Sequence, residues 1–217
     1  MLANRYATLQ PDRMCNLYTP IRTAAEIGRL FPAHDRTGNE PWPDDAYPDR
    51  LAPIIRQGVH GAEIVKARWG MPTPPTYLPA SGRDSGVTNI RNVGSPHWRR
   101  WLGPEHRCLV PVDRFSEPGA DRKPVWFASI DGGPMFFAGI EVRGWTSIRK
   151  VKDGETTDDL FGFLTCSPNA EVEEIHPKAM PVILRTQQEW ETWMSAPWGI
   201  AMKLQRPIAS GSLRIRA

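Results

Sequence analysis

A cysteine that follows a methionine, in the run Met14-Cys15-Asn16-Leu17-Tyr18, is the residue of this chain best suited to covalent chemistry. Translation from Met14 and removal of that methionine would leave Cys15 with a free α-amine beside its thiol. Two nucleophiles on adjacent carbons can trap an aldehyde as a five-membered thiazolidine ring, whereas an internal cysteine has only its thiol. The chemistry of Cys15 therefore depends on whether residues 1–13 remain attached.

Glu117 and His176 are two further residues that could move protons. Glu117 follows an apolar run, and His176 lies in a loop of residues 175–181 that leads into another apolar run. A carboxylate or an imidazole beside a cleft can act as a general acid or base. From spacing alone, however, a buried cysteine, a surface carboxylate and a solvated histidine are the commoner interpretations of Cys15, Glu117 and His176.

No metal-site or cofactor motif accompanies these residues. The sequence contains no Walker A loop, no dinucleotide-binding glycine pattern, no His-Glu-x-x-His and no Gly-x-Ser-x-Gly. The candidate zinc ligands lack the short spacing of a zinc site, so we expect neither a metal nor a cofactor. These candidates are Cys15, Cys108, Cys166 and His176. Cys108 and Cys166 lie in apolar runs, which predicts buried thiols.

Length and composition are those of a soluble protein with one hydrophobic core. The chain has 217 residues, of which 40% are hydrophobic and 24% are charged, as is ordinary for one globular domain. No apolar run approaches the roughly 18–20 residues that span a bilayer. The first thirteen residues lack the apolar stretch of a signal peptide. We therefore expect a cytoplasmic protein, and three widely spaced cysteines imply no disulfide framework.

Two capping boxes predict helices, and apolar runs predict strands. Residues 23–26 (Thr-Ala-Ala-Glu) should open one short helix, and residues 186–189 (Thr-Gln-Gln-Glu) should open another. The second helix carries a stripe of Trp190, Trp193 and Met194, which predicts core packing. Runs rich in branched and aromatic residues predict strands at Leu51–Gln57, Glu63–Trp69, Cys108–Val112, Val125–Ile130, Met135–Ile140 and Phe161–Cys166.

These elements predict a single α+β domain with a few short helices around a curved, mostly antiparallel sheet or barrel-like core. Residues 131–133 (Asp-Gly-Gly) favour a hairpin turn between two of the strands, and Lys150–Asp159 is polar enough for an exposed loop. We place the domain at residues 14–205. Residues 1–13 are then a leader or an over-extended start, and residues 206–217 are a C-terminal tail.

One stretch combines basic and aromatic residues, although the net charge of +3 is mild. The stretch holds Arg91, Trp98, Arg99, Arg100, Trp101 and Arg107. Cations that meet phosphates and rings that stack on bases suit a single nucleic-acid strand. The simpler interpretation, which composition alone favours, is a solvated basic face with two tryptophans in the core.

Five short motifs in a fixed order make the chain resemble the SOS-response-associated peptidase (SRAP) family. Each motif is weak alone, but the five in order are specific, and the similarity covers about Met14 to Trp193. The family pattern Met-Cys-Gly/Asn-Arg/Leu-Tyr/Phe corresponds to Met14–Tyr18, and Trp-Gly-Leu/Met-x-Pro corresponds to Trp69-Gly70-Met71-Pro72. Asn-Ala-Arg corresponds to Asn89-Ile90-Arg91. Arg-Cys-Leu-x-Pro with a following aromatic-x-Glu corresponds to Arg107 to Glu117, and His-x-Arg-Met-Pro corresponds to His176 to Pro181.

Proteins of this family bind single-stranded DNA and link covalently to abasic sites, whose sugar opens to an aldehyde. The resemblance implies that the Cys15 α-amine condenses with this aldehyde to a Schiff base and that the thiolate then closes a thiazolidine. It implies that Glu117 exchanges protons with the amine and a sugar hydroxyl. It also implies that His176 assists ring opening at the sugar oxygen and that Asn89 orients the cysteine or the sugar.

The same resemblance implies a DNA-binding surface around these residues. Arg91 would hold a phosphate beside the lesion, with Arg107 as a weaker candidate, and Trp69, Met71 and Pro72 would stack on or wedge the neighbouring bases. Binding would be independent of base sequence and weakened by salt. The implied DNA contacts are Asn16, Trp69, Gly70, Met71, Pro72, Arg91, Arg107 and Lys178. We expect a monomer that meets abasic single-stranded DNA at the nucleoid.

Two departures from the family pattern affect this interpretation. Residues 1–13 block the Cys15 amine if they are retained. Either Met14 is the true start, which is the simpler explanation, or the protein removes its own leader by the autopeptidase activity proposed for the family. The segment from His176 to Pro181 is one residue longer than the pattern and has Lys178 in place of arginine, so a phosphate contact there is monodentate at best.

Two other functions stay open from the sequence. A cysteine peptidase acting in trans would use Cys15 as nucleophile, His176 as base and Glu117 as helper. Such a peptidase tolerates an acylated Cys15, whereas thiazolidine chemistry needs the free amine. A non-covalent single-strand binder would keep all of its DNA association when Cys15 is replaced by alanine.

Overall fold

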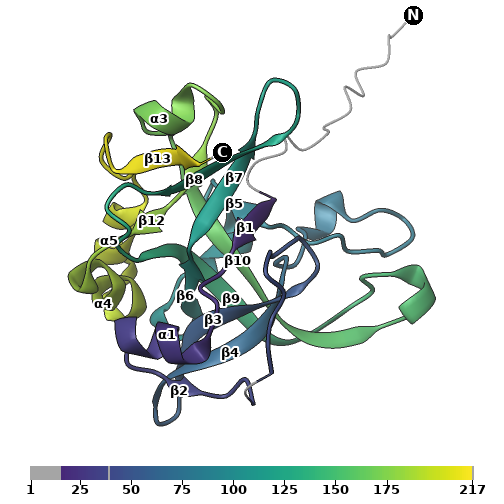
Figure 1. Ribbon diagram of the computed structural model, residues 1–217. Coiled ribbons are helices and arrows are strands. Elements are labelled where there is room, and N and C mark those ends of the chain that lie inside the picture. Colours follow the sequence, from purple (N-terminus) through teal and green to yellow (C-terminus); the bar gives the residue numbers. More distant parts are fainter. Residues whose placement is uncertain (1–15, 39, 217) are drawn as a thin grey trace, which may run out of the picture.

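The structure, a computed structural model, describes residues 16–38 and 40–216. Figure 1 shows a larger β-sheet that closes into a barrel, a smaller sheet packed beside it, and short helices at the periphery. The described strands divide into nine in the larger sheet and four in the smaller one. The predicted fold class, one α+β domain with a mostly antiparallel, barrel-like core, is confirmed.

Five strands of the larger sheet form the closed barrel, in the order β10-β4-β3-β6-β9 and back to β10. Neighbours are antiparallel except β4 and β10, which pair in parallel. The barrel strands are β3 (Leu51–Gly58), β4 (Gly61–Trp69), β6 (Arg107–Val112), β9 (Met135–Ser147) and β10 (Thr156–Cys166). Four two-residue strands extend it, namely β2 (His34–Asp35), β5 (Asn89–Ile90), β11 (Met180–Pro181) and β12 (Ile183–Leu184).

The smaller sheet has the order β1-β7-β8-β13 and is antiparallel throughout. Its strands are β1 (Leu17–Thr19), β7 (Arg114–Pro118), β8 (Pro124–Ser129) and β13 (Leu213–Arg216). The hairpin predicted at residues 131–133 is wrong, because this turn connects β8 of the smaller sheet to β9 of the barrel. The turn is tight, since Asp131 accepts hydrogen bonds from the Ser129 hydroxyl and the Gly133 amide, but its flanking strands diverge into different sheets.

Two segments expected to be irregular contain strands. The exposed loop predicted through Asp159 ends earlier, because Thr156–Asp159 begins β10, where Thr156 pairs with Ser147 of β9. Leu213–Arg216, which lies in the predicted C-terminal tail, forms β13 along the edge of β8. Leu213 is buried in the core. Both segments obtain backbone hydrogen bonds from strands outside their own stretch of sequence, so local polarity alone misjudges them.

The helices are short and lie outside the sheets. They are α1 (Ala24–Leu30), α2 (Pro96–Arg99), α3 (Ala170–Glu173), α4 (Gln187–Ser195) and α5 (Trp198–Ala201), with 3₁₀ turns η1 (Pro75–Tyr77), η2 (Pro104–His106), η3 (Val151–Asp153) and η4 (Met202–Leu204). Both predicted capping boxes are confirmed, at Thr23 and Thr186. The apolar stripe of α4 is buried, as predicted. None of the helices described here has the length and apolar character needed to cross a membrane.

A cluster of aromatic rings joins the two sheets. Tyr18 of β1 makes edge contacts with Trp69 of β4 and Phe137 of β9, at 5.1 and 5.8 Å between ring centroids. Phe115 of β7 contacts Phe137 at 5.8 Å, and Phe163 of β10 lies 4.6 Å from it. All five rings have no exposed surface. The smaller sheet is therefore fixed to the barrel by its inner, aromatic face.

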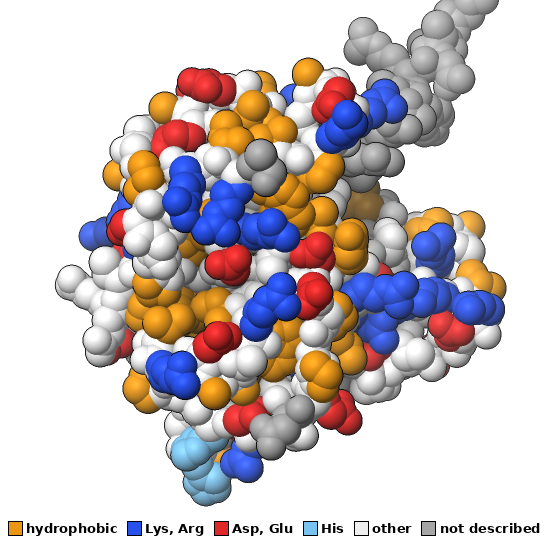
Figure 2. Space-filling model, viewed as in Figure 1, with side chains coloured by type: hydrophobic (Ala, Val, Ile, Leu, Met, Phe, Trp, Pro, Cys, Tyr) orange, Lys and Arg blue, Asp and Glu red, His pale blue; other side chains and the backbone are white. Residues whose placement is uncertain are grey.

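The outer surface mixes charges of both signs with apolar side chains. Figure 2 shows the face seen in Figure 1, where Lys and Arg side chains gather over the smaller sheet and acidic side chains lie below them. The orientation of the smaller sheet thus presents one aromatic face to the core and one partly basic face to solvent.

Candidate functional site

Glu117 lies on the inner face of the smaller sheet, near the end of β7. It pairs with Val125 of β8 and is 1% exposed. Alternation along β7 explains this burial, because Phe115 and Glu117 point to the same side and Phe115 belongs to the core. The surface position that is usual for a carboxylate at a strand end is therefore wrong for Glu117.

His176 reaches the same interior from the loop between α3 and β11. Its Nδ1 lies 2.9 Å from the Ala179 carbonyl oxygen and 3.8 Å from Oε2 of Glu117. A carbonyl oxygen can only accept, so Nδ1 is the ring nitrogen that carries the donated hydrogen. His176 is 8% exposed, so it is not the solvated loop histidine that spacing alone suggests. The fold thus brings Glu117 and His176 together across 59 residues of sequence.

Asn89 lies on β5, which pairs in parallel with β10, so that Asn89 is opposite Phe163. Its amide nitrogen donates to the Thr88 hydroxyl at 2.9 Å. Two residues farther along β10, Thr165 pairs with Pro181 of β11, the strand that follows the His176 loop. Strand β10 therefore positions both the Asn89 segment and the His176 segment.

The N-terminal part of the described chain enters beside Glu117. Leu17 pairs with Ser116, and the Ser116 hydroxyl donates to the Leu17 carbonyl at 3.3 Å. Asn16, a predicted DNA contact, is half-buried directly before this pair. Cys15, the predicted nucleophile, lies outside the described residues. The register of β1 on β7 thus places Asn16, the first described residue, at the end of β7 that carries Glu117.

The segment of residues 69–72 lies in the interior rather than on a DNA-facing surface. Trp69 and Met71 have no exposed surface, and Gly70 and Pro72 are also buried. The Trp69 ring stacks on Phe163 at 5.2 Å, and its Nε1 donates to the Thr88 carbonyl at 3.2 Å. A ring with both faces covered cannot stack on a base. The predicted base contacts of Trp69 and Met71 are therefore replaced by core packing that supports the Asn89 segment.

The predicted cationic contacts divide between surface and core. Arg91 and Lys178 are exposed, and Arg91 donates to the Ser167 hydroxyl at 3.1 Å. Arg107 has no exposed surface, and burial lowers the pKa of its guanidinium. The Arg107 Nη2 donates to the carbonyl of Ala196, the residue that caps the C-terminus of α4. Arg107 therefore stabilises a helix end and is not available to a phosphate without rearrangement.

The other members of the basic and aromatic stretch follow the simpler interpretation. Trp98 and Trp101 are 6% and 3% exposed, so they are core residues. Arg99 and Arg100 are exposed, and the Arg100 guanidinium lies 4.3 Å from the centre of the Trp101 ring.

Cys108 and Cys166 are buried thiols, as predicted. Burial raises the pKa of Cys108 well above its usual value and that of Cys166 to about 12. Neither thiol is therefore a ready nucleophile. Within residues 16–38 and 40–216, no three side chains of the metal-binding types converge on a common point.

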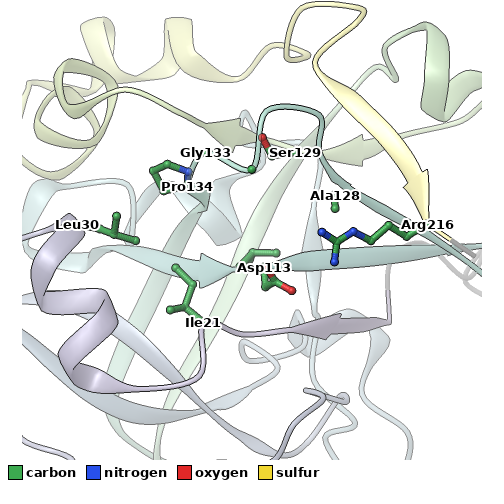
Figure 3. Close-up of a pocket in the computed structure, with 10 residues that line it drawn as sticks. Ile21, Leu30, Asp113, Ala128, Ser129, Gly133, Pro134 and Arg216 are labelled. Atoms are coloured by element: carbon green, nitrogen blue, oxygen red, sulfur yellow. The ribbon is translucent and has the colours of Figure 1, made fainter.

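A shallow hollow of about 210 Å³ lies apart from Glu117 and His176. Figure 3 shows its lining, with the Arg216 side chain extending toward Ala128 and Asp113, and Ile21 and Leu30 on the other side. None of Asn89, Glu117 and His176 lines it. This hollow lies where β8 and β13 of the smaller sheet meet α1, the end of β6 and the turn of residues 132–134.

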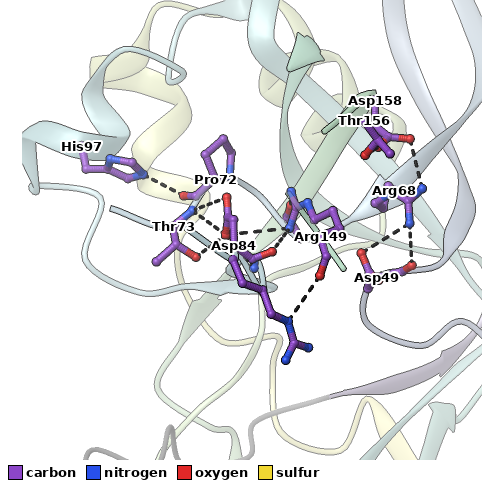
Figure 4. A network of polar contacts seen from close by, with 12 residues as sticks. Asp49, Arg68, Pro72, Thr73, Asp84, His97, Arg149, Thr156 and Asp158 are labelled. Carbon is purple, nitrogen blue, oxygen red and sulfur yellow. Dashed lines mark hydrogen bonds and ion pairs between the residues drawn. The ribbon is translucent and has the colours of Figure 1, made fainter. Parts of the chain in front are cut away.

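A buried ionic network holds the loop between Met71 and Asn89, and sequence reasoning missed it. Arg149 donates to the Gly70 carbonyl at 2.6 Å and lies 3.9 Å from Asp84, which accepts from the Thr73 hydroxyl at 2.5 Å (Figure 4). Gly86, with φ +78°, passes so close that an added Cβ would lie 2.9 Å from Gly70 Cα. The isolated glycines were the only local signal of this close approach.

His97 of α2 extends the same network. Its Nε2 donates to the Pro72 carbonyl at 2.9 Å, and its Nδ1 accepts from Arg100 Nη2 at 3.0 Å. Burial, together with the charge of Arg100, lowers the pKa of His97. The loop that leads to Asn89 is thus attached at both ends to buried polar groups.

Comparison with solved structures finds the same fold in bacterial proteins. A protein from Bordetella bronchiseptica has a TM-score of 0.72 and 24% identity, covering 94% of this chain and 99% of that one. A protein from Bacteroides thetaiotaomicron has a TM-score of 0.71 and 19% identity, covering 93% and 90%. A phage-related protein from Bordetella bronchiseptica has a TM-score of 0.65 and 16% identity, covering 93% of each chain.

Comparison with curated proteins gave no match. The family model described as SOS response associated peptidase (SRAP) matches residues 14–216, nearly the whole chain and all of the strands that surround Glu117 and His176. The match begins at Met14, immediately before Cys15. The chain therefore belongs to the SRAP family.

Proposed function

We propose that this protein binds single-stranded DNA and links covalently to abasic sites through an N-terminal Cys15, which shields the lesion. Membership of the SRAP family suggests a function related to DNA damage, and the family name adds the SOS response and a peptidase. The observation that carries the proposal is the register of β1 on β7. It places Asn16, the residue that follows Cys15 in the sequence, at the end of β7 that carries Glu117, beside His176.

The proposed reaction needs a proton donor and acceptor near the amine. The α-amine attacks the open-chain aldehyde, water leaves, and a Schiff base forms; the thiolate then adds to its carbon, and the nitrogen takes a proton. An ordinary α-amine and an ordinary thiol are both mostly protonated at neutral pH, so both need assistance there. Glu117 and His176 form a buried pair that can move these protons, with His176 Nε2 exchanging a proton at the sugar oxygen.

The proposed DNA contacts are the exposed Arg91 and Lys178 and the half-buried Asn16. Arg91 would hold a phosphate beside the lesion, Lys178 would make a single-point contact, and Asn16 would approach the sugar. Asn89 would orient the cysteine or the sugar. We expect the protein to act as a monomer at the nucleoid, in the cytoplasm, and to bind without base preference.

A cysteine peptidase acting in trans is the second candidate. It is favoured by the same Glu117–His176 contact at 3.8 Å, because a histidine that is held by the Ala179 carbonyl and lies beside a carboxylate can activate a thiol. The two candidates differ in what they require of Cys15. A peptidase needs only the thiol, whereas the crosslink needs both the thiol and the amine. If the protein itself removes residues 1–13, each molecule would cleave one peptide bond of its own chain by this peptidase chemistry.

The test is a denaturing gel of protein that begins at Cys15, mixed with a single strand that carries one abasic site. A shifted band that survives heat and detergent without borohydride, and is lost in Cys15→Ala, is the expected result. Retention of residues 1–13 should also abolish the band, because the amine is then acylated. If mass spectrometry shows a free Cys15 terminus and no band forms, the crosslinking proposal is rejected.

A further inference from the structure

We propose that the outer face of the smaller sheet is a second contact surface for single-stranded nucleic acid, separate from the Glu117 site. The strand register assembles this surface from distant parts of the chain. Ala128 of β8 lies between Arg114 of β7 and Arg214 of β13. In the next row on the same face, Trp126 lies between Ser116 and Arg216. We call Arg114, Trp126, Arg214 and Arg216 the outer patch.

The cations of the outer patch are available to a ligand. Arg214 and Arg216 are exposed, and Arg114 is half-exposed. Among the described residues, no acidic side chain lies within ion-pair distance of any of the three. Arg114 donates to the Thr19 hydroxyl at 3.0 Å, and that hydroxyl donates to the Asp45 carboxylate at 2.5 Å, so Arg114 is the most constrained of the three cations. Figure 2 shows Lys and Arg side chains over the smaller sheet, with acidic side chains next to them.

Trp126 gives the outer patch an aromatic surface between its cations. The ring is half-exposed, and the Arg114 guanidinium lies 4.3 Å from its centre. Cations for phosphates and a ring for a base are the combination that binds single strands without base preference. An acidic peptide would use the cations but not the ring, so the tryptophan favours nucleic acid as the ligand. The hollow lined by Ala128 and Arg216 adjoins this surface and also contains the exposed Asp113 (Figure 3).

The outer patch and Glu117 lie on opposite faces of one sheet. Side chains alternate along a strand, so Ser116, although itself buried, points to the face opposite Glu117. The hairpin that joins β7 to β8 lies at the Glu117 end of the sheet, and its Arg122 is exposed. A single DNA strand bound at the lesion site would pass around this hairpin to reach Trp126. In this respect the inference rests on the proposed function, and it extends DNA contact beyond the lesion.

The test measures fluorescence anisotropy of undamaged labelled single strands of about 8 and about 25 nucleotides, since one binding site covers about 4–16 nucleotides. For Arg214→Ala/Arg216→Ala, affinity for the long strand should fall about tenfold. Its salt slope should become shallower by about 1.4, or about 0.7 for each phosphate that an arginine no longer neutralises. Trp126→Leu should also weaken long-strand binding, with the salt slope unchanged. Affinity for the short strand should differ much less between the wild type and these variants.

A matched control removes two charges elsewhere. Lys150 and Lys152 lie at the η3 turn, far from the smaller sheet in Figure 1. The variant Lys150→Ala/Lys152→Ala should bind the short and the long DNA strand like the wild type. Equal losses of affinity in the control and in the Arg214/Arg216 variant would reduce the effect to overall charge and overturn the proposal. Wild-type affinity that does not rise with strand length would overturn it as well.

Crosslinking provides a separate readout. The Arg214→Ala/Arg216→Ala variant should still form the covalent band with a short abasic strand at the wild-type rate, because that strand occupies only the lesion site. If no protein forms the band but the outer-patch variants still weaken long-strand binding, the crosslinking proposal fails and the outer patch stands. If the band forms but the outer-patch variants bind the long strand like the wild type, the outer-patch proposal fails and the crosslinking proposal stands.

Discussion

At the scale of single residues, the environment of each ionisable group decides its role. Glu117 is buried beside His176, and a buried carboxylate is costly unless neighbouring polar groups compensate it. Arg107 is equally buried but bonds to the last turn of α4, so its charge stabilises a helix end. Both residues belong to sequence motifs of the family, yet of the two only Glu117 contacts another predicted catalytic residue, His176.

Glu117→Gln keeps the size of the side chain and removes its proton exchange. We expect the crosslinking rate at pH 7 to fall about 100-fold, the lower end of what a general acid or base contributes. Binding of an undamaged single strand should change less than about twofold, because a side chain this deeply buried does not reach the phosphates. A timed denaturing gel and an anisotropy titration measure the two quantities. A rate close to that of the wild type would remove Glu117 from the mechanism.

At the scale of elements, register and loop attachment bring together residues that the sequence separates. The outer patch forms because β13 returns to β8, although Arg114 and Arg216 lie far apart in the sequence. The local cluster of arginines and tryptophans around Trp98, by contrast, places its rings in the core. The loop before Asn89 depends on Arg149 in the same way, since Arg149 contacts both Gly70 and Asp84.

Gly86→Ala tests this loop attachment against Gly82→Ala. Both glycines have positive φ, +78° and +70°, so alanine is strained at either position. Only at Gly86 does the new methyl group meet Gly70 and Arg149, whereas nothing lies within 4 Å at Gly82. We expect Gly82→Ala to lower the free energy of unfolding by about 1 kcal/mol and Gly86→Ala by about 3 kcal/mol. Denaturant unfolding measures both, and equal losses of stability would show that the close approach is not tight.

At the scale of the whole molecule, the aromatic cluster makes the two sheets one cooperative unit. Phe137 contacts Tyr18 and Phe115 of the smaller sheet and Phe163 of the barrel. The Glu117–His176 contact spans the same boundary, because β7 belongs to the smaller sheet and the His176 loop leads to β11 of the larger one. The site therefore exists only when the sheets are packed together.

Phe137→Ala should lower the free energy of unfolding by about 3–5 kcal/mol, since it removes a fully buried ring. The transition should remain single, because removal of the ring loosens both sheets at once. Ile215→Ala on β13, which is 51% exposed, is the control and should cost less than about 1 kcal/mol. Two separate transitions in Phe137→Ala would contradict the idea of one cooperative unit.

The sequence by itself determined the local structure and the family. Capping boxes, apolar runs and five ordered motifs act over a few residues, so the helices at Thr23 and Thr186 and most barrel strands could be predicted from them. Only the tertiary structure decided which face each side chain occupies. Burial of Trp69 and Arg107, the pairing of β13 and the Glu117–His176 contact all depend on strands distant in sequence, whose register no local pattern encodes.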